Sequence, residues 1–129
     1  HYQVTEALFK PAAVQTPHIP IWVAAHWPFK RPLQRAARWD GVLPRPWNAG
    51  PITAEVLREI AVYIAQHRET DAPFDICKYG QTKGKDLAQD RALVQEYSAA
   101  GATWWIEEIS PGRGTLEQMR ERIITGPPR

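Results

Sequence analysis

The stretch Ile19–Pro44, IPIWVAAHWPFKRPLQRAARWDGVLP, contains a complete strand, loop, helix and second strand. Its first part, Ile19–Ala25, is a nearly continuous apolar run with a single proline, which is typical of a strand covered on both faces. Pro32 suits the first turn of a helix, and the apolar residues after it have helical spacing. The Asp-Gly pair at 40–41 ends that helix, and Val42-Leu43 begins a second strand. The stretch therefore predicts a βαβ unit with parallel strands.

The rest of the chain continues this alternation. Thr53 is placed to cap a helix with apolar residues at i, i+3, i+4 and i+7, and Asp90 is expected to cap the next one. Thr115 and Gln118 have the form of a capping box, and the helix that follows is expected to turn Leu116, Met119 and Ile123 towards the sheet. Strands are predicted at 74–80 and 103–106. Alternating strands and helices indicate a barrel or a doubly wound α/β fold.

Composition restricts the class of protein. Sixteen Lys and Arg oppose fourteen Asp and Glu, giving a net charge of +2, and these charges are interspersed, so we expect no nucleic-acid partner. The apolar stretches are far shorter than the roughly 20 residues that span a bilayer, and we expect no signal segment. Cys77 cannot form an internal disulfide and is expected to be buried. We predict a soluble cytoplasmic protein with no membrane contact.

Three blocks resemble a known family. WVAAHWP at 22–28, RAARWDGVLP at 35–44 and AGATWWIEEISPGRGTLEQMRERI at 100–123, with the closing GPPR, are similar to the C-terminal portion of luciferase-like flavin- or deazaflavin-dependent monooxygenases and oxidoreductases. A whole (β/α)8 barrel needs about 250 residues. The resemblance therefore implies an α/β fold that is the C-terminal half of a (β/α)8 TIM-type barrel, with four βα units in one partial domain over 1–129. Because the sequence starts at His1 without Met, we expect a cleaved or truncated chain.

Ligands of barrels bind where strands end, so the site is expected in the loops 25–31, 44–51, 78–86 and 107–114. The first loop combines backbone N–H groups with cations, which suits a phosphate. The resemblance implies that Ala24, Ala25 and His26 match the loop that holds the cofactor phosphate, and we add Arg31. The family usually has Gly-Gly where this chain has Ala24-Ala25. The alternative is that this loop is merely packed and its cations are solvated.

Four residues near the ends of the last two strands are candidates for substrate binding: Lys78, Trp105, Glu107 and Arg113. The alternative, which the residues alone favour, is that each of them is merely solvated or packed. Side chains alternate along a strand, so Trp104 and Trp105 should point to opposite sides, one towards the barrel and one under a helix.

The sequence contains no Ser/His/Asp order, zinc-ligand cluster or Walker-type loop, so no metal is predicted and no catalytic residue is assigned. Flavin chemistry fits this absence, because the cofactor carries the redox step. The resemblance implies part of an oxidoreductase or monooxygenase that uses FMN or a deazaflavin on an organic substrate, with the isolated fragment inactive. The alternative is a catalytically silent half-barrel that serves as a binding or assembly module. Either would need a missing N-terminal half or a second copy to cover its open strand edges.

Overall fold

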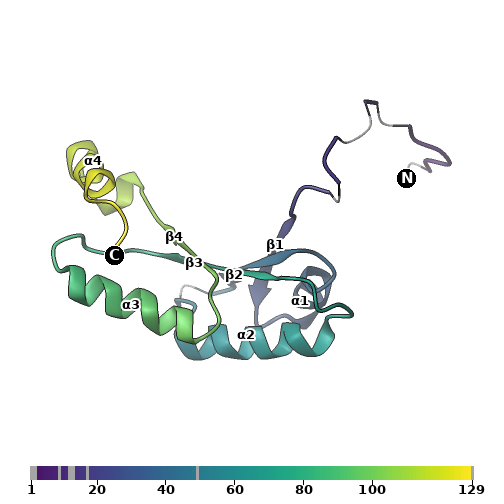
Figure 1. Ribbon diagram of the computed structural model, residues 1–129, viewed down its shortest axis with the longest axis horizontal. Helices are drawn as coiled ribbons and strands as arrows, with labels where there is room; N and C mark the ends of the chain where they lie inside the picture. Colours follow the sequence, from purple (N-terminus) through teal and green to yellow (C-terminus); the bar gives the residue numbers. More distant parts are fainter. Residues whose placement is uncertain (1–2, 9, 12–13, 17, 49, 129) are drawn as a thin grey trace.

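The computed structural model describes residues 3–8, 10–11, 14–16, 18–48 and 50–128. Its elements are, in order, β1 (Trp22–Trp27), α1 (Lys30–Ala36), β2 (Gly41–Pro46), α2 (Ala54–His67), β3 (Asp75–Gly80), α3 (Leu87–Ala99), β4 (Trp104–Glu107), the short 3-10 helix η1 (Pro111–Arg113) and α4 (Leu116–Thr125). The strands form one parallel sheet in the order β1-β2-β3-β4 (Figure 1). The predicted α/β class and the four βα units are confirmed.

The core lies between the sheet and the helices α1, α2 and α3, which cover the same face (Figure 1). Each strand turns alternate side chains to this face, and Ala25, Val42 and Ile76 are buried there. α1 and α2 bury their apolar stripes against these residues, as the helical spacing predicts, whereas the apolar side of α3 is only half-buried. The largest buried side chains of the helices are Leu33, Leu57, Ile60 and Ile64.

Side-chain caps explain where the longer helices begin. Thr53 accepts a hydrogen bond from the Val56 N–H at 3.3 Å, and Thr115 forms the complete capping box with Gln118, so both predicted caps are confirmed. The prediction for α3 is wrong, because Asp86 is the cap and Asp90 lies in the first turn. Asp90 is instead buried and binds a loop.

The predicted ends of the first two strands are also wrong. β1 runs from Trp22 to Trp27 rather than from 19 to 25, and β2 continues beyond Leu43 to Pro46. Six residue pairs join β1 and β2, and the Trp47 N–H still donates to the Trp27 carbonyl at 3.2 Å. This pairing holds β1 extended, so the expected loop 25–31 shrinks to Pro28 and Phe29.

α4 does not pack as predicted. Leu116 is 84% exposed and Ile123 is 63% exposed, Met119 is half-buried, and Arg122 is the buried residue of this helix. α4 stands apart from the layer formed by α1, α2 and α3 (Figure 1). A polar cluster, described below, therefore attaches this helix in place of an apolar face.

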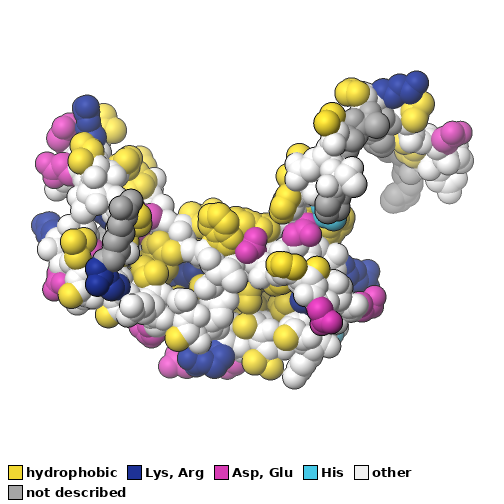
Figure 2. All heavy atoms as spheres, in the orientation of Figure 1, with side chains coloured by type: hydrophobic (Ala, Val, Ile, Leu, Met, Phe, Trp, Pro, Cys, Tyr) yellow, Lys and Arg dark blue, Asp and Glu magenta, His cyan; other side chains and the backbone are white. Residues whose placement is uncertain are grey.

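The sheet face opposite the helices α1–α3 is called the open face here. Side chains of all four strands share it by register, and Figure 2 shows hydrophobic side chains along this upper side of the sheet. Three large aromatic residues on it remain partly exposed, Trp22 at 37%, Tyr79 at 39% and Trp104 at 51%. In a closed barrel this face would line the interior.

Gly41 is required because Trp22 crosses β2. A Cβ atom at this position would lie 2.5 Å from Trp22 Cδ1 and 2.8 Å from the Asp75 carbonyl oxygen. Gly41→Ala is therefore expected to reduce the free energy of unfolding by about 1–3 kcal/mol, measured by urea denaturation. Gly50→Ala is the matched control, because a Cβ there meets nothing within 4 Å. Equal losses in both variants would contradict this account.

Candidate functional site

A cleft of about 280 Å³ opens between the carboxyl ends of β2 and β3. These strands pair over only two residue pairs, Gly41 with Asp75 and Val42 with Ile76. Continuing this ladder would require an N–H donor at Pro44 and then at Pro46, and proline has none. The strands consequently separate towards the end of the sheet where ligands of α/β folds bind.

Lys78 lines this cleft but its side chain runs on the helix side of the sheet. Its Nζ lies 4.6 Å from the ring centre of Tyr97 and 5.8 Å from that of Trp105, and it donates to the Tyr79 carbonyl. Burial lowers the pKa of Lys78. In the described part of the chain no carboxylate pairs with it, so aromatic rings are the main neighbours of this cation.

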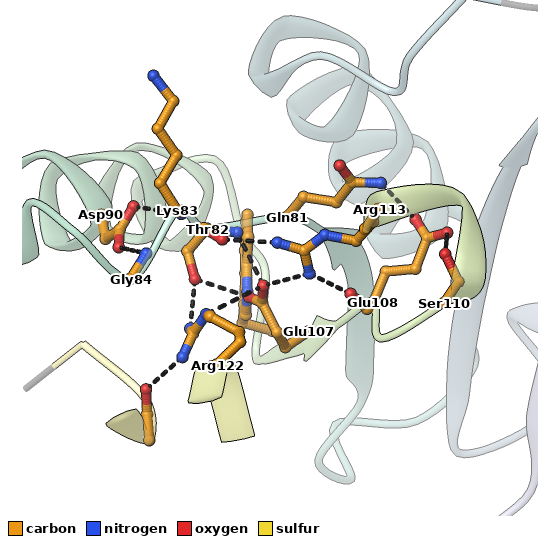
Figure 3. Close-up of polar contacts among 12 residues, drawn as sticks. Gln81, Thr82, Lys83, Gly84, Asp90, Glu107, Glu108, Ser110, Arg113 and Arg122 are labelled. Atoms are coloured by element: carbon orange, nitrogen blue, oxygen red, sulfur yellow. Dashed lines mark hydrogen bonds and ion pairs between the residues drawn. The ribbon is translucent and has the colours of Figure 1, made fainter. Parts of the chain in front are cut away.

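Glu107 is the centre of a polar cluster that joins the loop after β3 to η1 and α4 (Figure 3). Its Oε1 accepts from the Thr82 N–H at 2.9 Å and from Arg113 Nη1 at 2.8 Å, and it lies 3.5 Å from Arg122 Nε. Its Oε2 accepts from Thr82 Oγ1 and Trp105 Nε1, both at 2.9 Å. The carboxylate is thus fully occupied by the chain's own donors.

The two arginines tie further segments to this carboxylate. Arg113 donates to the carbonyl oxygens of Thr82, at 2.7 Å, and of Glu108. Arg122 donates to the Gly126 carbonyl at 2.6 Å and to Thr82 Oγ1. Figure 3 shows both guanidinium groups directed at Glu107 from two sides. The cluster therefore positions the loop after β3, the turn after β4 and the C-terminal helix together.

Opposing effects act on the pKa of Glu107. Burial raises it, but hydrogen bonds from Trp105, Thr82 and Arg113 together outweigh burial, and the pKa is lowered from its ordinary value. Glu107 is consequently ionised at neutral pH. It is suited to holding cations, and not to donating a proton.

Cys77 is buried as predicted, with 1% of its surface exposed. Burial, with a smaller contribution from the Asp75 charge, raises the pKa of its thiol to about 11. The thiol is therefore protonated at neutral pH and is a poor nucleophile.

The predicted cofactor residues lie on β1 and α1. Ala25 is completely buried in the core, whereas Ala24 and His26 are exposed on the open face and Arg31 is exposed on α1. His26 is the register partner of Arg45 on β2, a cation that the sequence analysis did not single out. Cation and imidazole thus share the carboxyl end of the open face.

The predicted substrate residues form a second group on β3, β4 and η1. Lys78 contacts Trp105, while Glu107 binds both Trp105 and Arg113, so the structure brings these four together. Trp105 points under α3, where it lies 5.8 Å from the Tyr97 ring, and Trp104 points to the open face. The predicted opposite orientation of the two indoles is confirmed.

Sequence reasoning missed Thr82 and Arg122, which complete the cluster. Arg122 lies in a helix for which the apolar residues were predicted to face the sheet, and Thr82 lies in a polar loop. The local signal was an arginine in the last turn of a helix, beside a Gly-Pro-Pro stop.

No family model, curated protein or solved structure matches the chain. Among the described residues, each helix is too short or too polar to cross a membrane.

Proposed function

We propose that this chain is half of a (β/α)8-type oxidoreductase that binds FMN or a deazaflavin and acts on an organic substrate. The observation that carries this proposal is the winding of the sheet. Four parallel strands follow one another in chain order, with α1, α2 and α3 on one face. A doubly wound sheet would place helices on both faces and reverse its strand order, so this arrangement favours a barrel.

The carboxyl end of the open face offers suitable groups for such a cofactor. His26 lies edge-on to the ring of Trp47 at 5.7 Å, and Arg45 lies 5.6 Å from the ring centre of Tyr79. Exposed aromatic rings suit a planar ring system, and the cations suit a phosphate. We therefore keep Ala24, His26 and Arg31 as cofactor residues and add Arg45.

The buried core position of Ala25 limits it to backbone contacts. For the substrate, Lys78 is the favoured contact because it lines the β2–β3 cleft. Trp105, Glu107 and Arg113 would act by positioning the cleft walls, since their polar atoms bind one another.

Titration of the full chain with FMN, and separately with a deazaflavin, tests the cofactor. We expect saturable quenching of the cofactor fluorescence by one of them. The double variant His26→Ala with Arg45→Ala should weaken binding by about tenfold or more, because the imidazole contact and the charge-assisted guanidinium contact to phosphate are both lost. Arg31→Ala, tested alone, should weaken it less.

Arg38→Ala is the control, because Arg38 is an exposed cation in the turn between α1 and β2, which lies at the amino end of the strands and so away from the proposed site. Absence of binding by both cofactors would refute the proposal. Equal weakening by the control and by the double variant would refute the assigned site.

A second candidate is a catalytically silent binding or assembly module. The amino end of the open face is filled by the chain's own side chains, since Trp22 lies 5.4 Å from Trp104 and donates to Asp75 at 3.1 Å. Asp75 also accepts from Thr103 at 3.0 Å. These contacts among the chain's own side chains leave less space for a cofactor over this part of the open face. Association of the chain without binding of either cofactor would favour this alternative.

A further inference from the structure

A second cavity, of about 690 Å³, lies between the loop after β3, η1 and α4, and is called the α4 cavity here. Its volume falls within the range of small-molecule sites, about 300–1,000 Å³. Its walls come from the loops that follow β3 and β4 and from α4. The cavity therefore lies at the carboxyl ends of the strands, where ligands of barrels bind. Neither the cofactor residues nor the β2–β3 cleft includes its cationic wall.

Arg122 contributes a buried guanidinium to this wall with donors to spare. Only 7% of the residue is exposed, and its Nε is a buried polar atom without a hydrogen-bond partner. A guanidinium carries five N–H donors. In the described part of the chain Arg122 uses two of them, towards Gly126 and Thr82. Nε has only the longer 3.5 Å approach to Glu107, whose acceptors are shared by other donors.

The wall also holds an excess of positive charge. Its charged residues are Lys83, Lys85, Arg113, Arg122 and Glu121. Glu107 pairs with both arginines, and the oxygens of buried Asp90 accept from backbone N–H groups of the adjoining loop. Glu107 and the exposed Glu108 offset the charge of the arginines, but in the described part of the chain no carboxylate forms an ion pair with Lys83 or Lys85. Buried donors beside uncompensated charge favour an anion over water, because water supplies no negative charge.

The loop over Arg122 is preformed. Asp90 binds the Lys83 and Gly84 N–H groups at 2.9 and 2.7 Å, which fixes the backbone between the two lysines. Gly84 has a φ of +73°, and a Cβ there would lie 3.0 Å from Arg122 Cδ. The lysines are therefore carried by a loop whose path is set before any ligand arrives.

From these observations we infer that the α4 cavity binds the oxyanion group, phosphate or carboxylate, of a small molecule. Arg122 is the buried cation of the cavity wall, and the exposed lysines of this wall, Lys83 and Lys85, are called its rim. This function does not depend on the redox proposal, because its residues differ from those assigned to the cofactor.

Isothermal titration of the full chain with inorganic phosphate, and separately with citrate, tests the inference and distinguishes the two oxyanions. The rim variant Lys83→Gln with Lys85→Gln should weaken the bound anion by about tenfold, since two cationic contacts are lost. Both lysines are exposed, so this variant should keep its thermal midpoint. The control is Arg38→Gln with Arg58→Gln, which removes the same charge from exposed positions outside the cavity.

Saturable binding of either anion, weakened by the rim variant and kept by the control, would support the site. Absence of heat with both anions would overturn it. Equal weakening by rim and control variants would also overturn it, since the attraction would then be a general effect of surface charge. Neither titration contains a flavin, so failure here leaves the cofactor proposal standing, and the reverse also holds.

Discussion

Replacing Glu107 by alanine is expected to reduce the free energy of unfolding by about 3 kcal/mol, because it leaves two arginines without their shared carboxylate. The side chains of Arg113 and Arg122 are only 11% and 7% exposed, and Glu107 is 21% exposed, so solvent can replace the lost contacts only in part. The Thr82 N–H and Trp105 Nε1 would lose their acceptor as well. Urea denaturation followed by circular dichroism measures this loss.

Glu108→Ala is the control for this prediction. Glu108 is the exposed neighbour of Glu107, and its side chain accepts from Gln81 and Ser110. Removing an exposed carboxylate of the same type should cost less than about 1 kcal/mol. A similar loss in both variants would show that the cluster has no special role in stability.

The pH dependence of stability provides a second measurement of the same effect. The folded-state pKa of Glu107 lies below its ordinary value of 4.5, so the contribution of its ionised form is complete above that value. This contribution is lost as the pH falls from 4.5 through the folded-state pKa. Stability curves of the chain and of Glu107→Ala should therefore converge with acidification in that window. A constant difference down to the lowest pH would contradict the assignment.

Local signals were sufficient for the order and type of the elements. Thr53 and Thr115 are caps because a side-chain oxygen next to a helical apolar stripe has a nearby N–H to bind, whatever the rest of the fold does. Strand ends depend on the neighbouring strand instead. Pro44 predicts the end of the strand, yet β2 continues to Pro46. It does so because its other edge still pairs with β1, which accepts hydrogen bonds from the backbone there. The end of β2 therefore could not be predicted from the sequence of this strand alone.

The residues of the site also divide into those that a local pattern predicts and those that only the tertiary fold brings together. Glu107 and Arg113 were singled out by their place after a strand, and they do meet. Arg122 and Thr82 join them from segments 40 residues apart, a juxtaposition that only the tertiary fold creates. The buried side of α4 was predicted wrongly for this reason. Periodicity predicts that Leu116 and Ile123 are buried, but the cluster buries Arg122 and leaves these two residues exposed.

Association is the second prediction with a large expected effect. β1 and β4 are the two edges of the sheet, and the backbone groups on their outer sides lack a strand partner in the described chain. Unpaired edges and a partly apolar face favour pairing with another chain. Covering about 400 Å² of apolar surface would favour association by about 10 kcal/mol before the cost of binding is subtracted. The partner is expected to be another barrel half or a second copy.

Light scattering during size-exclusion chromatography measures this association directly. We expect a mass above the 14.7 kDa of one chain. The mass should fall towards that value in Trp104→Lys, which replaces the 51% exposed indole on the open face by a charged side chain. Val62→Lys is the matched control, because Val62 is 53% exposed on the outer side of α2. Circular dichroism should show that both variants remain folded. If the unmodified chain stays a folded monomer at high concentration and ignores an added N-terminal barrel half, the half-barrel interpretation is wrong, because its edges and open face would then be stable in water without a partner.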